Sequence, residues 1–141
     1  MPKPKLTPKN RAIVEKALRA MLWWPETYDQ GKWIEHDLER RATKRRPAPY
    51  CGTVACIAGH IALAAGARFA YVDVMRFRGE LWGVNLIADE ILGEGAARAL
   101  FDARADWWPG EFRLPFQAAE TAKARATIAV ARVRHWLRTG K

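Results

Sequence analysis

Cys51, Cys56 and His60 stand close together in the middle of the chain and are the residues best suited to chemistry. Thiolates and imidazoles are the ligands that zinc prefers. On a helix, Cys56 and His60 would be four residues apart on one face, and Cys51 could reach over the helix start. A fourth ligand would have to be His36, Asp37 or water, and the spacing C-x4-C-x3-H matches no common closed zinc site. The three residues are therefore candidate metal ligands in only one of three interpretations.

The second interpretation is a thiol enzyme. Cys51 would lie just before a helix, whose N-terminal dipole lowers a thiol pKa and favours a nucleophile. Cys-Gly before an apolar helix faintly resembles papain-like peptidases of the bacteriocin-processing type, and that resemblance implies a histidine from a following sheet. Here only His135, on a predicted C-terminal helix, lies downstream. In the third interpretation Thr53 caps the helix, the two cysteines are small buried hydrophobic residues, and His60 is a hydrogen-bonded core histidine. We favour this structural interpretation and keep the other two as alternatives.

The composition is that of a folded domain with an excess of positive charge. The chain has 141 residues, of which 50% are hydrophobic and 28% charged, and its formal net charge is +9. Two cysteines are too few for a disulfide framework, so a cytoplasmic protein is expected. The charged, proline-rich N-terminus does not resemble a secretory signal. Residues 47–67 lack charge, but their prolines, glycines and alanines argue against a membrane span.

The cations gather near the two ends of the chain. On a C-terminal helix, Lys123, Arg134, Arg138 and Lys141 would share one flank of the apolar stripe, and Arg125 and Arg132 the other. Such surfaces suit a nucleic acid or an acidic protein surface, although basic clusters are often simply solvated. A second predicted cluster comprises Arg40, Arg41, Lys44, Arg45 and Arg46.

Seven tryptophans are a large number for a chain of this length. They could stack on single-stranded bases, anchor a protein interface, or fill an alanine-rich core. Trp33, Trp82 and Trp136 lie on apolar stripes and are predicted in the core. In the two Trp-Trp pairs neighbouring side chains diverge, and Trp24 and Trp108 are predicted to be the exposed contact residues.

The predicted fold is mostly α, a compact bundle of about five helices around a buried central helix near 53–66, with a small β element near 69–77. Residues 1–6 are expected to be a flexible basic tail and 7–141 a single helical domain. Thr7 and Pro8 predict a helix start, and Pro25 ends that helix at Trp23 or Trp24. The other predicted helices are a short one from about residue 33 into the 40–46 cluster, 53–66 capped by Thr53, 81–92 stopped by Gly93, further turns at 96–101, and about 117–139.

The string from Tyr50 to His60 carries a Cys-Gly-Thr-x-x-Cys-x-Ala-Gly core and resembles small uncharacterised proteins of bacteria, phages and plasmids. Weaker likeness extends to Pro25, Tyr28-Asp29-Gln30-Gly31 and Trp33, and to Ile91-Leu92-Gly93 and Ala99-Leu100-Phe101. The resemblance implies a setting in mobile elements and no activity. Those proteins often have Trp where this chain has His60, which argues against an indispensable chemical role for His60.

These observations predict a non-enzymatic accessory protein of a mobile element. It would bind a macromolecule through its basic surfaces, with inhibition of a host defence complex as one form of that role. A nucleic-acid-binding protein is the alternative, and a thiol enzyme or zinc protein using Cys51, Cys56 and His60 is the second. No Walker, GxGxxG, HExxH, GxSxG or EF-hand pattern is present, so no cofactor is expected.

Overall fold

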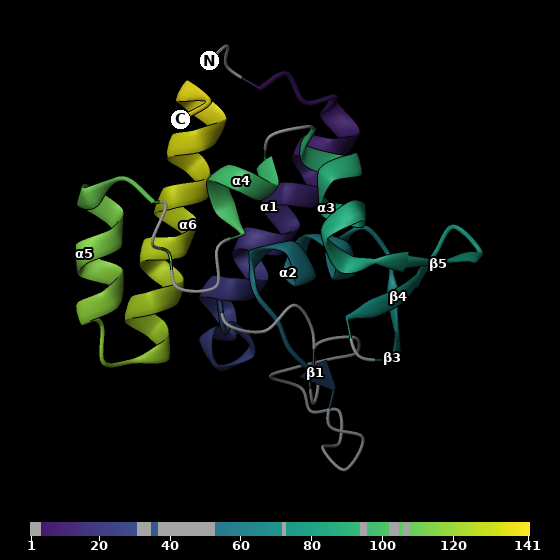
Figure 1. The fold of residues 1–141 in the computed structure, drawn as a ribbon, viewed down its shortest axis with the longest axis horizontal. Helices are drawn as coiled ribbons and strands as arrows, with labels where there is room; N and C mark the ends of the chain where they lie inside the picture. The colour runs from purple at the N-terminus through teal and green to yellow at the C-terminus, as the bar shows by residue number, and fades with distance from the viewer. Residues whose placement is uncertain are drawn as a thin grey trace.

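The fold is mostly α-helical with a small three-stranded antiparallel sheet, as predicted (Figure 1). The computed structural model describes residues 4–30, 35–36, 53–71, 73–93, 96–101, 105 and 108–141. The helices of this part are α1 (Pro8–Trp23), the 3-10 helix η1 (Pro25–Thr27), α2 (Ile57–Ala64), α3 (Val84–Leu92), α4 (Ala96–Leu100), α5 (Gly110–Ala118) and α6 (Ala122–Thr139). The strands are β1 (Glu35–His36), β2 (Thr53–Val54), β3 (Arg68–Tyr71), β4 (Val74–Phe77) and β5 (Glu80–Gly83).

Helix α1 begins and ends where the sequence predicts. The Thr7 side chain accepts a hydrogen bond from the Asn10 N–H at 3.1 Å, and Pro8 occupies the first turn, where its missing N–H costs nothing. Trp24 has left helical geometry, with φ −130°, because the following Pro25 disfavours it there. Leu6, expected in the tail, packs half-buried against the core.

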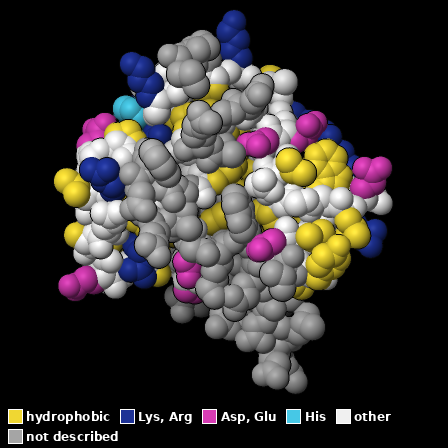
Figure 2. All heavy atoms as spheres, viewed as in Figure 1, with side chains coloured by type: hydrophobic (Ala, Val, Ile, Leu, Met, Phe, Trp, Pro, Cys, Tyr) yellow, Lys and Arg dark blue, Asp and Glu magenta, His cyan; other side chains and the backbone are white. Residues whose placement is uncertain are grey.

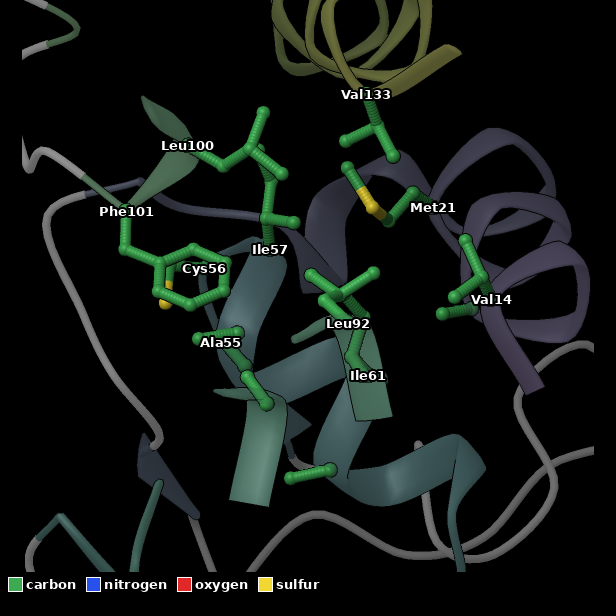
Figure 3. Packing of buried hydrophobic residues seen from close by; sticks show 14 of the residues in the cluster. Val14, Met21, Ala55, Cys56, Ile57, Ile61, Leu92, Leu100, Phe101 and Val133 are labelled. Carbon is green, nitrogen blue, oxygen red and sulfur yellow. The ribbon is translucent and has the colours of Figure 1, made fainter. Parts of the chain in front are cut away.

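Helix α2 is the centre of the structure, and every one of its residues is buried. It packs between α1 and α3, and no charged residue interrupts its surface. In Figure 3 Ile57 of α2 lies beside Leu100 of α4 and Ile61 beside Leu92 of α3, while Val133 of α6 points at Met21 of α1. The predicted central helix is therefore confirmed, although it is shorter than residues 53–66.

Thr53 is not the helix cap that the sequence predicts. Thr53–Val54 form strand β2 and pair antiparallel with Glu35–His36 of β1, so Cys56 becomes the N-cap residue. The predicted helix near residue 33 is wrong at Glu35 and His36, and its other residues lie outside the described part. Both errors have one cause: pairing between distant segments satisfies these backbone groups and outweighs local helix signals.

The predicted β element near 69–77 is confirmed and extends further, as the sheet β3-β4-β5. Strands β4 and β5 are joined by Arg78 and Gly79, both with positive φ, 52° and 78°. Two such residues make the turn whose twist matches a hairpin. The Arg78 side chain pairs with Glu90 at 3.1 Å, and its guanidinium lies 4.7 Å from the centre of the Phe77 ring.

Two predicted helices start later than their sequence patterns suggest. Leu81 pairs with Arg76 across the sheet, so α3 begins at Val84, whereas its predicted stop at Gly93 is confirmed by a φ of 98°. The predicted 117–139 helix is two helices, because α5 ends at Ala118 and the Thr121 side chain caps α6. The predicted turns at 96–101 correspond to α4.

Arg125 and Arg132 do not form the second basic flank of α6 that the sequence predicts. Arg125 is half-buried and donates a hydrogen bond to the Ala119 carbonyl at 3.0 Å. Arg132 is 1% exposed, and its guanidinium donates to the main-chain oxygens of Lys141, at 2.7 Å, and Ala99, at 3.1 Å. Arg132 thus joins α6 to the last turn of α4, where a cation also complements the helix dipole.

Replacing Arg132 with Ala is expected to lower the free energy of unfolding by about 3 kcal/mol. The change leaves two carbonyl oxygens without their donor and opens a cavity between α4 and α6. Arg138→Ala removes an exposed cation from the same helix and should change stability by less than about 0.5 kcal/mol. Urea denaturation of both variants tests this, and equal midpoints would contradict the structural role of Arg132.

Candidate functional site

The described part of the cysteine motif links two distant segments of the chain just before α2 begins. The Ala55 N–H donates to the Thr27 carbonyl at 2.8 Å, and the Ala55 carbonyl accepts from the Asp29 N–H at 3.0 Å. This short parallel bridge ties the end of η1 to the residue just before the Cys56 cap. The motif therefore brings two segments into contact that are far apart in the sequence.

His60 strengthens the same junction from the first turn of α2. Its side chain is fully buried, and Nε2 lies 2.9 Å from the Thr27 carbonyl oxygen. Because a carbonyl only accepts, Nε2 carries the hydrogen and donates it. Burial lowers the pKa of His60 to about 4, against a smaller opposing effect of the Thr27 hydrogen bond. His60 is therefore neutral at pH 7 and fits the predicted core histidine.

Cys56 is placed for packing and not for nucleophilic attack. It is 2% exposed, and burial raises the pKa of its thiol to about 12, although backbone N–H groups of Ala58 and Gly59 partly oppose the shift. A thiol with this pKa carries almost no thiolate at neutral pH. Cys51, the nucleophile proposed from the sequence, lies outside the described residues.

The zinc interpretation gains no geometric support from the described residues. No three His, Cys, Asp or Glu side chains of this part lie close enough together to hold a metal ion. The His60 Nε2 atom, one of the two ring nitrogens that could bind a metal, donates to Thr27 instead. Cys51 and Asp37 lie outside the described part, and the side chain of His36 is not described either.

Two of the weaker pieces of the sequence resemblance, Tyr28–Gln30 and Ala99–Phe101, meet at this junction. The Tyr28 hydroxyl donates to Gln30 Oε1 at 2.8 Å, and Gln30 Nε2 donates to the Leu100 carbonyl at 2.9 Å. In Figure 3 Phe101 lies beside Cys56 and Ala55. Residues 28–30, 55–60 and 99–101 are thus connected by main-chain hydrogen bonds and by the buried side chains of Tyr28, Gln30 and His60.

The largest described group of exposed cations lies elsewhere, along α1 and α6. These two helices pack side by side and contain nine Lys and Arg residues but a single acidic residue, Glu15, which pairs with Arg134 at 3.6 Å. Arg11 and Arg19 lie one turn on either side of Glu15, and Arg138 lies one turn beyond Arg134. We call the exposed cations of this region the α1–α6 basic face: Arg11, Lys16, Arg19, Lys123, Arg134 and Arg138.

The predicted site residues divide between this face, the core and the undescribed part of the chain. Lys123, Arg134 and Arg138 are exposed on the basic face, beside cations of α1 that the sequence analysis had not singled out. The Arg40, Arg41, Lys44, Arg45 and Arg46 cluster lies outside the described residues.

The predicted exposure of Trp24 and Trp108 is wrong. Trp108 is 2% exposed and packs against Phe116, with ring centres 4.9 Å apart. Trp24 is half-buried against the core, whereas its neighbour Trp23 is 66% exposed. Since adjacent helical side chains diverge by about 100°, one member of a pair can be buried and the other exposed, but the pair alone does not say which. Trp136 is buried and Trp82 half-buried as predicted, and Trp33 lies outside the described part.

A shallow hollow of about 300 Å³ lies at the end of α1, beside the exposed Trp23. Lys16, Arg19 and Trp23 are separated by three, four and seven residues, and on a helix this spacing places two cations and an aromatic ring on one face. This spacing is the sequence signal from which the hollow could have been predicted. Its described walls are Lys16, Arg19, Ala20, Trp23 and Trp24.

A different surface of the molecule is apolar. Tyr71, Leu81 and Leu86 are about half exposed on and beside the three-stranded sheet. Hydrophobic side chains gather over this side of the molecule in Figure 2, on the right of the view. Among the described helices, none is both long and apolar enough to cross a membrane.

Comparison of the chain with protein-family models, with curated proteins and with solved structures returned no match. The roles given to its residues come from their own contacts, burial and charge.

Acidification is expected to destabilise the fold through His60. Its pKa is about 4 in the folded protein, compared with 6.5 for an ordinary histidine, so the unfolded chain takes up the proton first. Stability should be lost as the pH falls from about 6.5 to about 4, by about 3 kcal/mol in total from this residue. Urea denaturation across this range measures the loss.

His60→Gln should remove the part of the pH dependence that belongs to this residue, while carboxyl groups continue to titrate. His135→Gln, a change at a half-buried histidine next to Phe112, is the control. If wild type and His60→Gln lose stability equally over this pH range, the buried imidazole is not the cause.

Cys56 should resist alkylation until the protein unfolds. In reducing buffer, iodoacetamide is expected to leave Cys56 unmodified in the native protein and to modify it in urea, because reaction needs an accessible thiolate. Peptide mass spectrometry reports Cys56 separately from Cys51. Native Cys56 reacting as fast as cysteine in solution would contradict its burial.

Proposed function

We propose that this chain is a non-enzymatic binding protein that takes an anionic macromolecule on the α1–α6 basic face. The observation that carries the proposal is the segregation of charge: the six exposed cations of this face lie on two adjacent helices that contain a single carboxylate, Glu15. By contrast, α3 contains Asp89 and Glu90 and no Lys or Arg. A one-sided charge distribution attracts a partner of opposite sign to one part of the surface.

The geometry of α1 and α6 adds a second argument. The Arg134–Glu15 pair and the packing of the two helices keep cations of both helices on one continuous surface. In Figure 1 the first turn of α1 and the last turn of α6 lie at the same end of the molecule, so the helices run antiparallel. Arg11 therefore lies toward the Arg138 end of α6. A partner with regularly spaced negative charges can meet several of these cations at once.

The buried chemistry supports a binding role over a catalytic one. Cys56 carries a raised thiol pKa and His60 donates its Nε2 hydrogen to the main chain, so neither is placed to act on a substrate. The resemblance of the motif to small proteins of phages and plasmids supports an accessory role in a mobile element, in the cytoplasm of its host. The partner would then be a nucleic acid or an acidic protein surface, including that of a host defence complex.

Charge reversal on the basic face is the test of this proposal. Labelled single-stranded and double-stranded nucleic acid and polyglutamate are titrated with the protein over a salt series and followed by fluorescence anisotropy. Wild type should bind at least one of them, with an affinity that falls log-linearly with salt. Arg134→Glu with Arg138→Glu should weaken binding at least about tenfold, because two contacts become repulsive.

The matched control is Arg68→Glu with Arg76→Glu, which changes the net charge equally on exposed cross-strand neighbours of β3 and β4. Charge reversal on the sheet should lower the affinity for the polyanion much less than charge reversal on α6. Equal losses would show that binding follows net charge alone, and absence of binding to all three polyanions would remove the proposal.

A further inference from the structure

Trp23 is the most exposed large hydrophobic side chain among the described residues, at 66%. Its ring is held from one side by Trp24, with centres 5.9 Å apart and planes at 77°. Trp24 in turn packs half-buried against the core. The contact with Trp24 restricts the movement of the Trp23 ring. Stacking of a partner on this ring therefore costs little side-chain entropy of Trp23.

Two cations line the same hollow as this ring. Lys16 and Arg19 lie seven and four residues before Trp23 on α1, and all three line the hollow of about 300 Å³. That volume is at the lower end of small-ligand sites and admits one planar group. The hollow thus offers an aromatic surface for a ring and two cations for the negative charge attached to it.

The outer face of α1 extends this arrangement along the helix. Lys9, Lys16 and Trp23 are seven residues apart and lie nearly in line, with about 10 Å of helix between successive members. Lys9 lines a second hollow, of about 280 Å³, which it shares with Arg78. The positive end of the helix dipole lies in the first turn, beside Lys9, and favours an anionic group there.

We propose that single-stranded nucleic acid binds along the outer face of α1, with one base stacked on Trp23 and adjacent phosphates neutralised by Lys16 and Arg19. The inference rests on the proposed function and names the partner class. An acidic protein segment could neutralise the cations, but it does not carry an aromatic ring beside each negative charge. A duplex keeps its bases stacked inside, whereas a single strand presents base and phosphate together.

Trp23→Ala is the decisive variant, tested with labelled oligo(dT), oligo(U), a duplex of equal length and polyglutamate. Loss of the stacking surface should weaken binding to both single strands roughly 10-fold to 100-fold. Binding to the duplex and to polyglutamate should change by less than about twofold, because the cations remain. Trp23→Phe should restore part of the single-strand affinity, since a smaller ring still stacks.

Leu22→Ala is the matched control, because Leu22 is the adjacent exposed residue of α1, 38% accessible. It should leave all four affinities unchanged, and circular dichroism checks that each variant folds. A second readout is tryptophan fluorescence: oligo(dT) should quench wild type, and Trp23→Phe should abolish most of that quenching.

The outcomes separate this inference from the proposed function. If Trp23→Ala binds single strands as tightly as wild type, or loses affinity for the duplex and polyglutamate to the same extent, the stacking site is wrong. Salt-dependent binding of any of the polyanions would still leave the proposed function standing. If wild type binds none of the four probes, both proposals fail.

Discussion

The structure depends on the burial of α2, a short helix without a polar face. A segment with eight buried residues can be stable only if other elements cover it on all sides, because each exposed apolar side chain would forfeit about 1.5–3 kcal/mol. Helices α1 and α3 pack against it directly, and Leu100 of α4 lies beside its first residue, Ile57, in Figure 3. The buried residue just before its N-cap, Ala55, also needs backbone partners inside the protein, and the Thr27–Asp29 segment supplies them.

This constraint explains why the residues most suggestive of chemistry are packed away. Cys56 and His60 stand at the start of the central helix, where water is excluded and charged forms are penalised. The shifts oppose reactivity in both cases: the thiol keeps its proton and the imidazole stays neutral. Their hydrogen-bonding and packing partners, Thr27 and Phe101, come from other parts of the chain, so the motif acts as a junction of three segments.

Covering the central helix also determines which surfaces of α1 and α6 face outward. Once the apolar stripe of each helix faces the core, its cations must lie on the remaining surface, and the packing of α1 beside α6 joins the two sets. Arg132 is the exception, since it is buried and satisfies carbonyl oxygens of α4 and of the chain beyond α6. Pro25 ends α1 after Trp23, and the turn that follows carries Trp24 against the core and leaves Trp23 outside.

Local signals in the sequence determined the mostly helical fold, the start and end of α1, the stop at Gly93, the buried central helix and the hairpin that begins near residue 69. Each depends on a few neighbouring residues: a cap, a proline, a glycine with positive φ, or an apolar run. The sequence did not determine the true start of α2, the pairing of β1 with β2, the separation of α5 from α6, or the exposure of Trp23 instead of Trp24 and Trp108. The start of α2 and the pairing of β1 with β2 depend on residues tens of positions apart, such as Thr27 with Ala55 or Glu35 with Val54. Only the tertiary structure decides which backbone groups and side chains lose their water, because that loss is set by neighbours that the local sequence does not contain.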